Sequence, residues 1–330
     1  MIVAEKLKKV YGDTVAVDDV SFTIEPGRVT GFLGPNGAGK STTMRMIMGL
    51  DHPSSGRVSV DGVSYADLPA PLREVGALLE AKAIHPGRSA YQHLNWLAAS
   101  NGIDRRRIDE VLDVVGLTEV AGQRAGRFSL GMGQRLGIAA ALLGDPDVLL
   151  FDEPVNGLDP EGILWVRNLM KSLAAEGRTV LVSSHLMSEM ALTADHLIVI
   201  GRGRILADQP TTSFIAENSA SHVRVRSPRL GELSEQMRSA GWDVAMSEKD
   251  ASTVLVHGAT AEQIGNLAGR SGTFVHELTP VHASLEEAFM RMTADSVQYH
   301  AGTTAAPDQT AAVSQPATER DRADLTGVGA

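Results

Sequence analysis

The chain has 330 residues, 43% of them hydrophobic, which is enough to bury one large core and a second, smaller one. Its formal net charge of −10 argues against a general nucleic-acid-binding protein, because such proteins usually present a basic face. The chain contains no cysteine, which excludes disulfides and thiolate metal sites and is typical of a cytoplasmic protein. The first residues lack the apolar stretch of a signal peptide, and no apolar run reaches about 18 residues, so we expect no membrane span.

The N-terminal part of the chain predicts strands followed by one helix. Two alternating segments between Ile2 and Ile24 predict antiparallel strands that end at a Pro-Gly turn. The apolar run 29–33 predicts a buried strand, and the helix-forming residues 43–48 follow a few positions later. Residues 57–63 predict a further strand with an Asp-Gly turn.

The segment between the buried strand and the helix reads GPNGAGKST and fits the phosphate-loop pattern G-x-x-x-x-G-K-[ST]. Its glycines let backbone N–H groups point inward as an anion nest, next to the positive end of the helix dipole. We expect Lys40 to reach the terminal phosphates and Ser41 to ligate the Mg²⁺ that bridges them. A glycine turn that carries a lysine by chance is the less probable interpretation. The predicted nucleotide contacts in this loop are Gly34, Pro35, Asn36, Gly37, Ala38, Gly39, Lys40, Ser41 and Thr42.

The middle of the chain predicts helices and then strands of a parallel sheet. Residues from about 86 to 145 are mainly helical in pattern. The runs 148–151 and 179–183 are rich in β-branched residues, as in strands buried on both faces, and residues 160–175 predict a helix between them. Residues 1–215 are therefore expected to form an α/β domain.

Two adjacent carboxylates end the first of these strands, in the segment DVLLFDEP. A phosphate-loop enzyme needs an acidic group near its Mg²⁺, so we expect Asp152 on the metal side. Glu153 is then placed to polarise or position the water that attacks the γ-phosphate. A solvated acidic pair is the simpler alternative. His185 ends the second strand and is a candidate for contacting the γ-phosphate and this water, although a lone histidine is often structural.

The C-terminal third predicts a separate unit. Residues 216–298 alternate strand, helix, strand, strand, helix, strand and helix, which indicates a small α/β accessory domain. The last helix, with the sequence SLEEAFMRM, is either an amphipathic docking or dimer element or a core helix of this domain. Residues 299–330 contain too few large apolar groups to offset the cost of ordering, and we expect them to be disordered.

Five motifs in this order and spacing resemble the ATP-binding-cassette (ABC) ATPases over residues 2–210. They are GPNGAGKST, FSLGMGQRL (128–136), VLLFDEP, NGLDP (156–160) and SSH (183–185). The resemblance implies an ABC-type phosphate-loop fold with a mixed sheet core, an antiparallel β subdomain and a helical subdomain at about 80–145. It also implies ATP hydrolysis with Mg²⁺ and catalytic roles for Lys40, Glu153 and His185.

In this family two nucleotide-binding domains close head to tail around two ATP molecules. The resemblance therefore implies that Ser129 and Gly131 act on the ATP of the other subunit, and that Asp159 couples the two sites. Tyr11 matches the aromatic residue that stacks on adenine, although a tyrosine in a turn is the plainer alternative. Glu80 falls where the family has its Q-loop glutamine, which would bring an additional negative charge near Mg²⁺.

The signature reads Phe-Ser-Leu-Gly-Met where the family norm is Leu-Ser-Gly-Gly-Gln. The chain resembles the ABC-2 exporter ATPases of the bacitracin and daunorubicin resistance type in this departure, in Glu80 and in its C-terminal extension. The implied function is the ATPase subunit of a bacterial exporter, a homodimer at the cytoplasmic face of the membrane that powers a permease on a separate chain and binds no nucleic acid.

Two other functions are considered. A soluble ABC ATPase of DNA repair or translation usually shows a long coiled coil, zinc-binding cysteines or a second cassette, and the sequence has none of these. A regulatory subunit that binds ATP without hydrolysing it is disfavoured by Glu153 and His185.

Overall fold

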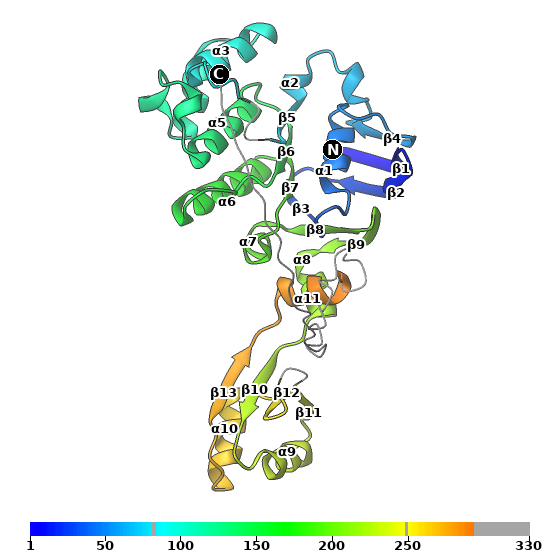
Figure 1. The fold of residues 1–330 in the computed structure, drawn as a ribbon, viewed down its shortest axis with the longest axis vertical. Helices are drawn as coiled ribbons and strands as arrows, with labels where there is room; N and C mark the ends of the chain where they lie inside the picture. Colours follow the sequence, from blue (N-terminus) through cyan, green and yellow to red (C-terminus); the bar gives the residue numbers. More distant parts are fainter. Residues whose placement is uncertain (81–83, 248–249, 294–330) are drawn as a thin grey trace, which may run out of the picture. The chain divides into compact units, whose positions relative to one another are not determined.

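The computed structural model describes residues 1–80, 84–247 and 250–293 (Figure 1). The predicted disordered segment 299–330 lies outside these residues. The chain begins with an antiparallel sheet in the order β2-β1-β4, formed by β1 (Ile2–Tyr11), β2 (Thr14–Ile24) and β4 (Ser55–Val60). The predicted Asp-Gly turn is confirmed, since Asp61 and Gly62 both have positive φ and turn the chain back after Val60.

A six-stranded sheet in the order β5-β6-β7-β3-β8-β9 forms the centre of the fold. Its strands are β3 (Val29–Leu33), β5 (Val75–Leu78), β6 (Val148–Asp152), β7 (Thr179–Ser183), β8 (His196–Gly201) and β9 (Arg204–Pro210). All neighbouring pairs are parallel except β8 and β9, which are antiparallel. The carboxyl ends of β3, β6 and β7 therefore lie at the same edge of the sheet, where ligands bind in such folds.

Alternate residues of the central strands enter two different apolar clusters. On β6, Leu149 and Phe151 belong to the first cluster, whereas Val148 and Leu150 belong to the second. Successive side chains on a strand point to opposite faces of the sheet, so the two clusters lie on opposite faces and both faces are covered. This explains why these strands read as continuous apolar runs in the sequence.

Helices cover both faces of this sheet (Figure 1). The first cluster includes residues of the longer helices and the second includes α1, together with the N-terminal sheet. The helices up to residue 218 are α1 (Lys40–Ile47), α2 (Pro71–Glu74), α3 (Ala90–Ser100), α4 (Arg106–Val114), α5 (Leu130–Leu142), α6 (Pro160–Ala175), α7 (Met187–Thr193) and α8 (Thr211–Asn218). Short 3₁₀ turns cover Tyr65–Asp67, Thr118–Val120 and Ala125–Arg127.

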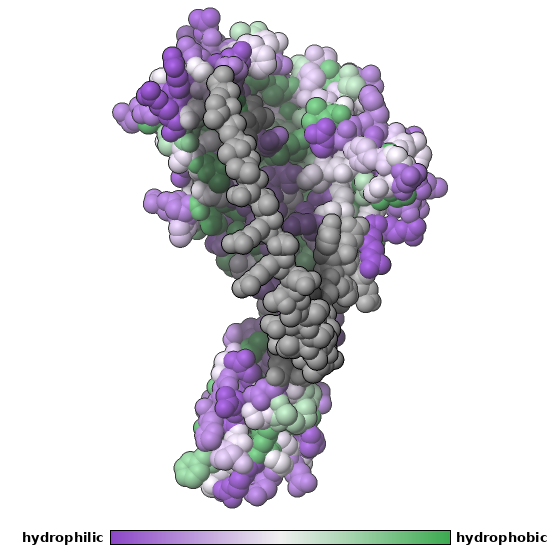
Figure 2. All heavy atoms as spheres, in the orientation of Figure 1, coloured by the Kyte–Doolittle hydropathy of each residue, from purple (hydrophilic) through white to green (hydrophobic). Residues whose placement is uncertain are grey.

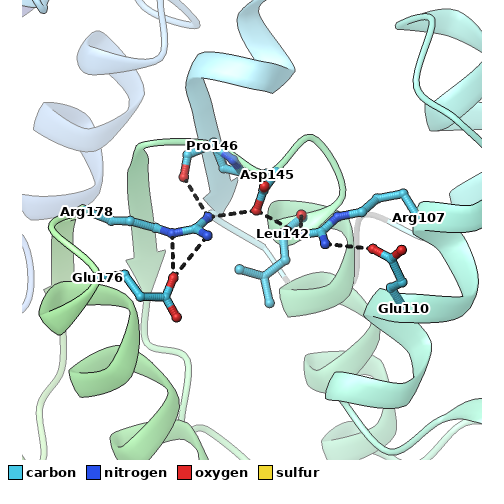
Figure 3. A network of polar contacts seen from close by, with 7 residues as sticks. All are labelled: Arg107, Glu110, Leu142, Asp145, Pro146, Glu176 and Arg178. Atoms are coloured by element: carbon cyan, nitrogen blue, oxygen red, sulfur yellow. Dashed lines mark hydrogen bonds and ion pairs between the residues drawn. The ribbon is translucent and has the colours of Figure 1, made fainter.

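An ion-pair network fixes the loop that leads from α5 into β6 (Figure 3). The carboxylate of Asp145 accepts from Arg107 at 2.9 Å and from Arg178 at 3.0 Å. Arg107 comes from α4 and also bonds the carbonyl of Leu142, while Arg178 bonds the carbonyl of Pro146. The network thus ties the helical segment and the start of β7 to the strand that ends at the two adjacent carboxylates.

Residues 222–281 form a third sheet with its own apolar cluster. Its elements are β10 (His222–Arg226), α9 (Leu230–Ser239), β11 (Asp243–Met246), β12 (Thr253–His257), α10 (Ala261–Arg270) and β13 (Glu277–Val281). The antiparallel strand order β11-β12-β10-β13 is that of a β-α-β-β-α-β ferredoxin-like unit. The strand β13 begins three residues later than the predicted FVHEL strand, because Phe274 is exposed and precedes the pairing with β10.

The last described helix, α11 (Leu285–Thr293), packs against α8 and α7 and buries Leu285, Ala288 and Phe289 in the first cluster. Its apolar stripe is therefore buried within the chain and does not pack in the core of the small sheet. Hydrophilic and hydrophobic residues are interspersed over the visible face of the molecule (Figure 2). Within the described residues, no helix combines the length and the apolar character that a membrane span requires.

Candidate nucleotide-hydrolysis site

The loop between β3 and α1 has the shape of an anion nest. Gly37 and Gly39 adopt positive φ values of 78° and 109°, which only glycine adopts at low cost. A side chain at Gly39 would also place its Cβ 2.7 Å from the carbonyl oxygen of Ala16. The loop therefore depends on glycine for both conformation and space. It leads directly into the N-terminus of α1, where backbone N–H groups are free to bind an anion.

Lys40 lies over this loop. Its Nζ donates to the carbonyl oxygens of Gly34 at 2.6 Å and Pro35 at 3.2 Å. Burial lowers the pKa of the Lys40 ammonium, and the carboxylates of Glu153 and Asp152 oppose this shift. The carbonyl oxygens of the loop offer only partial negative charge to the Lys40 ammonium, and a phosphate group in the nest would supply a full negative charge.

The loop and the end of β6 line one cavity of about 280 Å³. Its lining residues are Ala16, Asn36, Gly37, Ala38, Gly39, Lys40, Ser41, Thr42, Asp152 and Glu153. The hydroxyl of Ser41 donates to Asp152 Oδ2 at 2.8 Å. A hydroxyl and a carboxylate oxygen held together in this way are the kind of ligands that Mg²⁺ takes beside phosphates.

Glu153 follows Asp152 and faces His185. The Nδ1 atom of His185 lies 2.8 Å from Glu153 Oε2. Glu153 has a φ of 52°, a left-handed backbone conformation that is uncommon for a residue with a side chain. The two residues that were singled out separately in the sequence are therefore in direct contact.

The signature residues lie in a different hollow. Ser129 caps the N-terminus of α5 by accepting from the N–H of Met132 at 3.2 Å. It lines a hollow of about 350 Å³, and no described residue lines both this hollow and the phosphate-loop cavity. Gly131 approaches the NGLDP loop, where a Cβ on Gly131 would lie 3.2 Å from the carbonyl oxygen of Gly157. Asp159 caps α6 through the N–H of Gly162.

Tyr11 and Glu80 line neither of these two hollows. The hydroxyl of Tyr11 donates to Asp51 Oδ2 at 2.9 Å, and Lys9 Nζ lies 4.8 Å from the centroid of its ring. Partial burial and the Asp51 carboxylate raise the pKa of the Tyr11 hydroxyl. Glu80 is exposed at the end of the segment that follows β5 and lines a groove of about 340 Å³ with residues that include Arg45 and His93.

Three residues of the site were not predicted from the sequence. Ser183 donates to Asp152 Oδ1, and its Oγ accepts from the N–H of Glu153 at 3.1 Å. Gln134 donates to the carbonyl oxygen of Glu153 at 3.0 Å. Asp51 bonds Tyr11 and Arg45. The position of Ser183 at the end of a strand beside β6 was the one available signal, because parallel neighbours bring their carboxyl ends together.

A phosphate nest, a Ser–Asp pair and a Glu–His pair at the carboxyl edge of a mostly parallel sheet define a phosphate-loop nucleotide hydrolase. A family model described as "ABC transporter" matches residues 17–156, and a model described only as a domain of unknown function matches residues 221–286.

Two relatives and one solved structure show the extent of the similarity. The bacitracin transport ATP-binding protein BcrA of Bacillus licheniformis is 35% identical over 299 residues, 87% of this chain and 95% of the relative. The Nod factor export ATP-binding protein I of Burkholderia pseudomallei is 32% identical over 299 residues, 88% of this chain and 95% of the relative. A dimeric post-hydrolysis structure of the ATP-binding cassette MJ0796 with ADP and Pi has a TM-score of 0.59 and 26% identity, covering 64% of this chain and 99% of that one.

The chain belongs to the ABC transporter family. It is an ATP-binding and ATP-hydrolysing subunit with the α/β fold of the ABC ATPase domains, which confirms the class predicted from its five motifs. The matches to transport subunits favour this class over a soluble ABC ATPase of DNA repair or translation.

Proposed function

We propose that this chain is the ATPase subunit of a bacterial ABC-2-type exporter. It works as a homodimer at the cytoplasmic face of the membrane and drives a permease on a separate chain. Relatives that match nearly all of this fold are named for bacitracin transport and for Nod factor export, which supports this assignment.

The observation that carries the proposal is the separation of the two halves of the site. Lys40, Asp152 and Glu153 share one cavity, whereas Ser129 lines another. Among the described residues of one chain, the helix end capped by Ser129 therefore lies outside the cavity that would hold the γ-phosphate. A second copy arranged head to tail supplies Ser129 and Gly131, and the matching solved cassette is a dimer. Asp159 then lies beside this interface, and Tyr11 stacks on the adenine.

The residues present fit Mg²⁺, since Ser41 Oγ and Asp152 Oδ2 are oxygen ligands that already lie 2.8 Å apart. When bound, this ion neutralises charge on the β- and γ-phosphates. The protein then has three tasks. Lys40 stabilises the negative charge of the transferred group, and Ser183 and Ser41 keep the Asp152 carboxylate oriented. Glu153 and His185 hold the attacking water.

In the chemical step, the water oxygen forms a bond to the γ-phosphorus while Glu153 accepts the water proton. The bond from the γ-phosphorus to the bridging oxygen breaks, and its electron pair leaves with ADP. The product is inorganic phosphate. ATP contacts both subunits only in the closed dimer, so its binding shifts the population towards closure and hydrolysis reverses the shift.

The decisive variant is Glu153→Gln. It retains the shape of the side chain but cannot accept the proton, so we expect ATP binding to persist and phosphate release to fall roughly 100-fold or more. The variant Glu119→Gln, at an exposed position remote from the motifs, is the matched control. Light scattering of Glu153→Gln with Mg-ATP should give a dimer. Near-normal phosphate release would disprove the role of Glu153, and a monomer at saturating Mg-ATP would disprove the shared site.

A further inference from the structure

The backbone of Glu153 is held in an unfavourable conformation. Its φ of 52° places a residue with a side chain in the left-handed region, and the next residue is Pro154, which restricts it further. Such conformations persist where the surrounding structure over-determines them, and they are frequent at active sites. The direction of the Glu153 side chain, and so its approach to His185, depends on this backbone.

Four hydrogen bonds hold the two peptide groups of Glu153. Its N–H donates to the carbonyl oxygen of Ser183 at 3.2 Å and to Ser183 Oγ at 3.1 Å. Its carbonyl oxygen accepts from the N–H of Asn156 at 3.2 Å and from Gln134 Nε2 at 3.0 Å. Three of these bonds come from β7 and from the turn itself. The fourth comes from a separate element, α5.

Gln134 is almost completely buried, with 3% of its surface exposed. A buried amide requires a hydrogen-bond partner, and here the N–H of the amide is directed at the carbonyl of the water-activating residue. The helix that carries Gln134 is capped at its N-terminus by Ser129, the serine assigned to the ATP of the second subunit. One helix thus carries a residue for each of the two nucleotide sites.

We propose that Gln134 is a positioning residue for hydrolysis. It fixes the peptide plane after Glu153 and thereby holds the Glu153 carboxylate in the orientation in which it contacts His185. Gln134 does not touch the nucleotide or the water. This inference rests on the proposed function, because it requires Glu153 to activate the water.

The test is Gln134→Met, which keeps the volume of the side chain and removes the N–H donor. Loss of one hydrogen bond that orients the base should lower kcat about fivefold to tenfold, while KM and ATP affinity stay within about twofold. Leu142→Met is the matched control, since Leu142 is buried on the same helix outside the signature motif and such swaps are well tolerated. It should leave kcat unchanged.

A double-mutant cycle separates positioning from general damage. In the Glu153→Gln background, Gln134→Met should not lower the residual rate further, because the group that it positions no longer acts as a base. A merely structural role would reduce the rate by the same factor in both backgrounds. If Gln134→Met folds poorly, Gln134→Glu keeps the shape and presents an acceptor to the carbonyl, and it should lower kcat at least as strongly.

The outcomes are distinguishable. Three results would each overturn the positioning role: a normal kcat in Gln134→Met, equal losses in both backgrounds, or a change confined to KM. With any of these results, an inactive Glu153→Gln protein would still support the role of Glu153. Normal turnover by Glu153→Gln itself would overturn both proposals.

Discussion

Ser183 offers the sharpest test of how the carboxylates are oriented. Its side chain is fully buried, and its hydroxyl donates to Asp152 Oδ1 and accepts from the N–H of Glu153. The Ser183→Ala variant removes both bonds without adding volume. The Glu153 N–H keeps the backbone carbonyl of Ser183 as a partner, so the larger loss is the bond to the charged Asp152.

A hydrogen bond to a charged group contributes about 1.5–3 kcal/mol. If this energy is used to hold the carboxylates for catalysis, kcat falls roughly 10- to 150-fold, because each 1.36 kcal/mol corresponds to a factor of ten. The assay is phosphate release at saturating ATP, with stability followed by urea unfolding. Ser234→Ala is the control, since Ser234 is also buried and hydrogen-bonded but lies in α9. Unchanged kcat in Ser183→Ala, or a loss confined to KM, would refute the orientation argument.

Two further predictions concern charge. Lys40→Ala should weaken ATP affinity at least tenfold in an equilibrium binding assay, because it removes the point charge over the nest. The control Lys171→Ala, on the exposed face of α6, should leave the affinity unchanged. Equal affinities of the two variants would contradict the assignment of Lys40. Hydrogen bonds from the Ser252 hydroxyl and N–H and from the Thr253 hydroxyl lower the pKa of Asp250 to about 2. The stability contributed by Asp250 is therefore present above its ordinary pKa and is lost as pH falls through about 2. Asp250→Asn should be less stable than the natural protein at pH 7, and the difference should shrink as the pH falls towards 2. A difference as large at pH 2 as at pH 7 in urea unfolding would show another cause.

The sequence predicted the central strands well because they are buried on both faces. The runs 148–151 and 179–183 read as continuous β-branched segments, and helix α6 has Pro160 after a capping Asp159, so its bounds were predicted correctly. The strand β13 was shifted because an exposed Phe274 resembles a strand residue in sequence. An exposed aromatic residue just before a strand and one within the strand look the same in the sequence pattern.

Two of the three site residues that were not predicted from the sequence share one property. Gln134 lies 19 residues from Glu153 and Ser183 lies 30 residues from it, and both contacts involve backbone atoms of Glu153. Backbone groups are present at every position, so such partners leave no local pattern in the sequence. Glu153 and His185 were each predicted to act on the attacking water, but their direct contact was not predicted; it arises because they follow neighbouring strands of one parallel sheet.

The departure at the signature loop has a packing explanation. The family norm has glycine where this chain has Leu130, and Leu130 lies against Gly157 of the NGLDP loop. A Cβ at Gly157 would come within 2.2 Å of Leu130 Cδ2, and Gly157 has a φ of 74°. The larger residue is therefore accommodated because its neighbour has no side chain. The same contact packs the loop that ends in Ser129 against the loop that leads to Asp159.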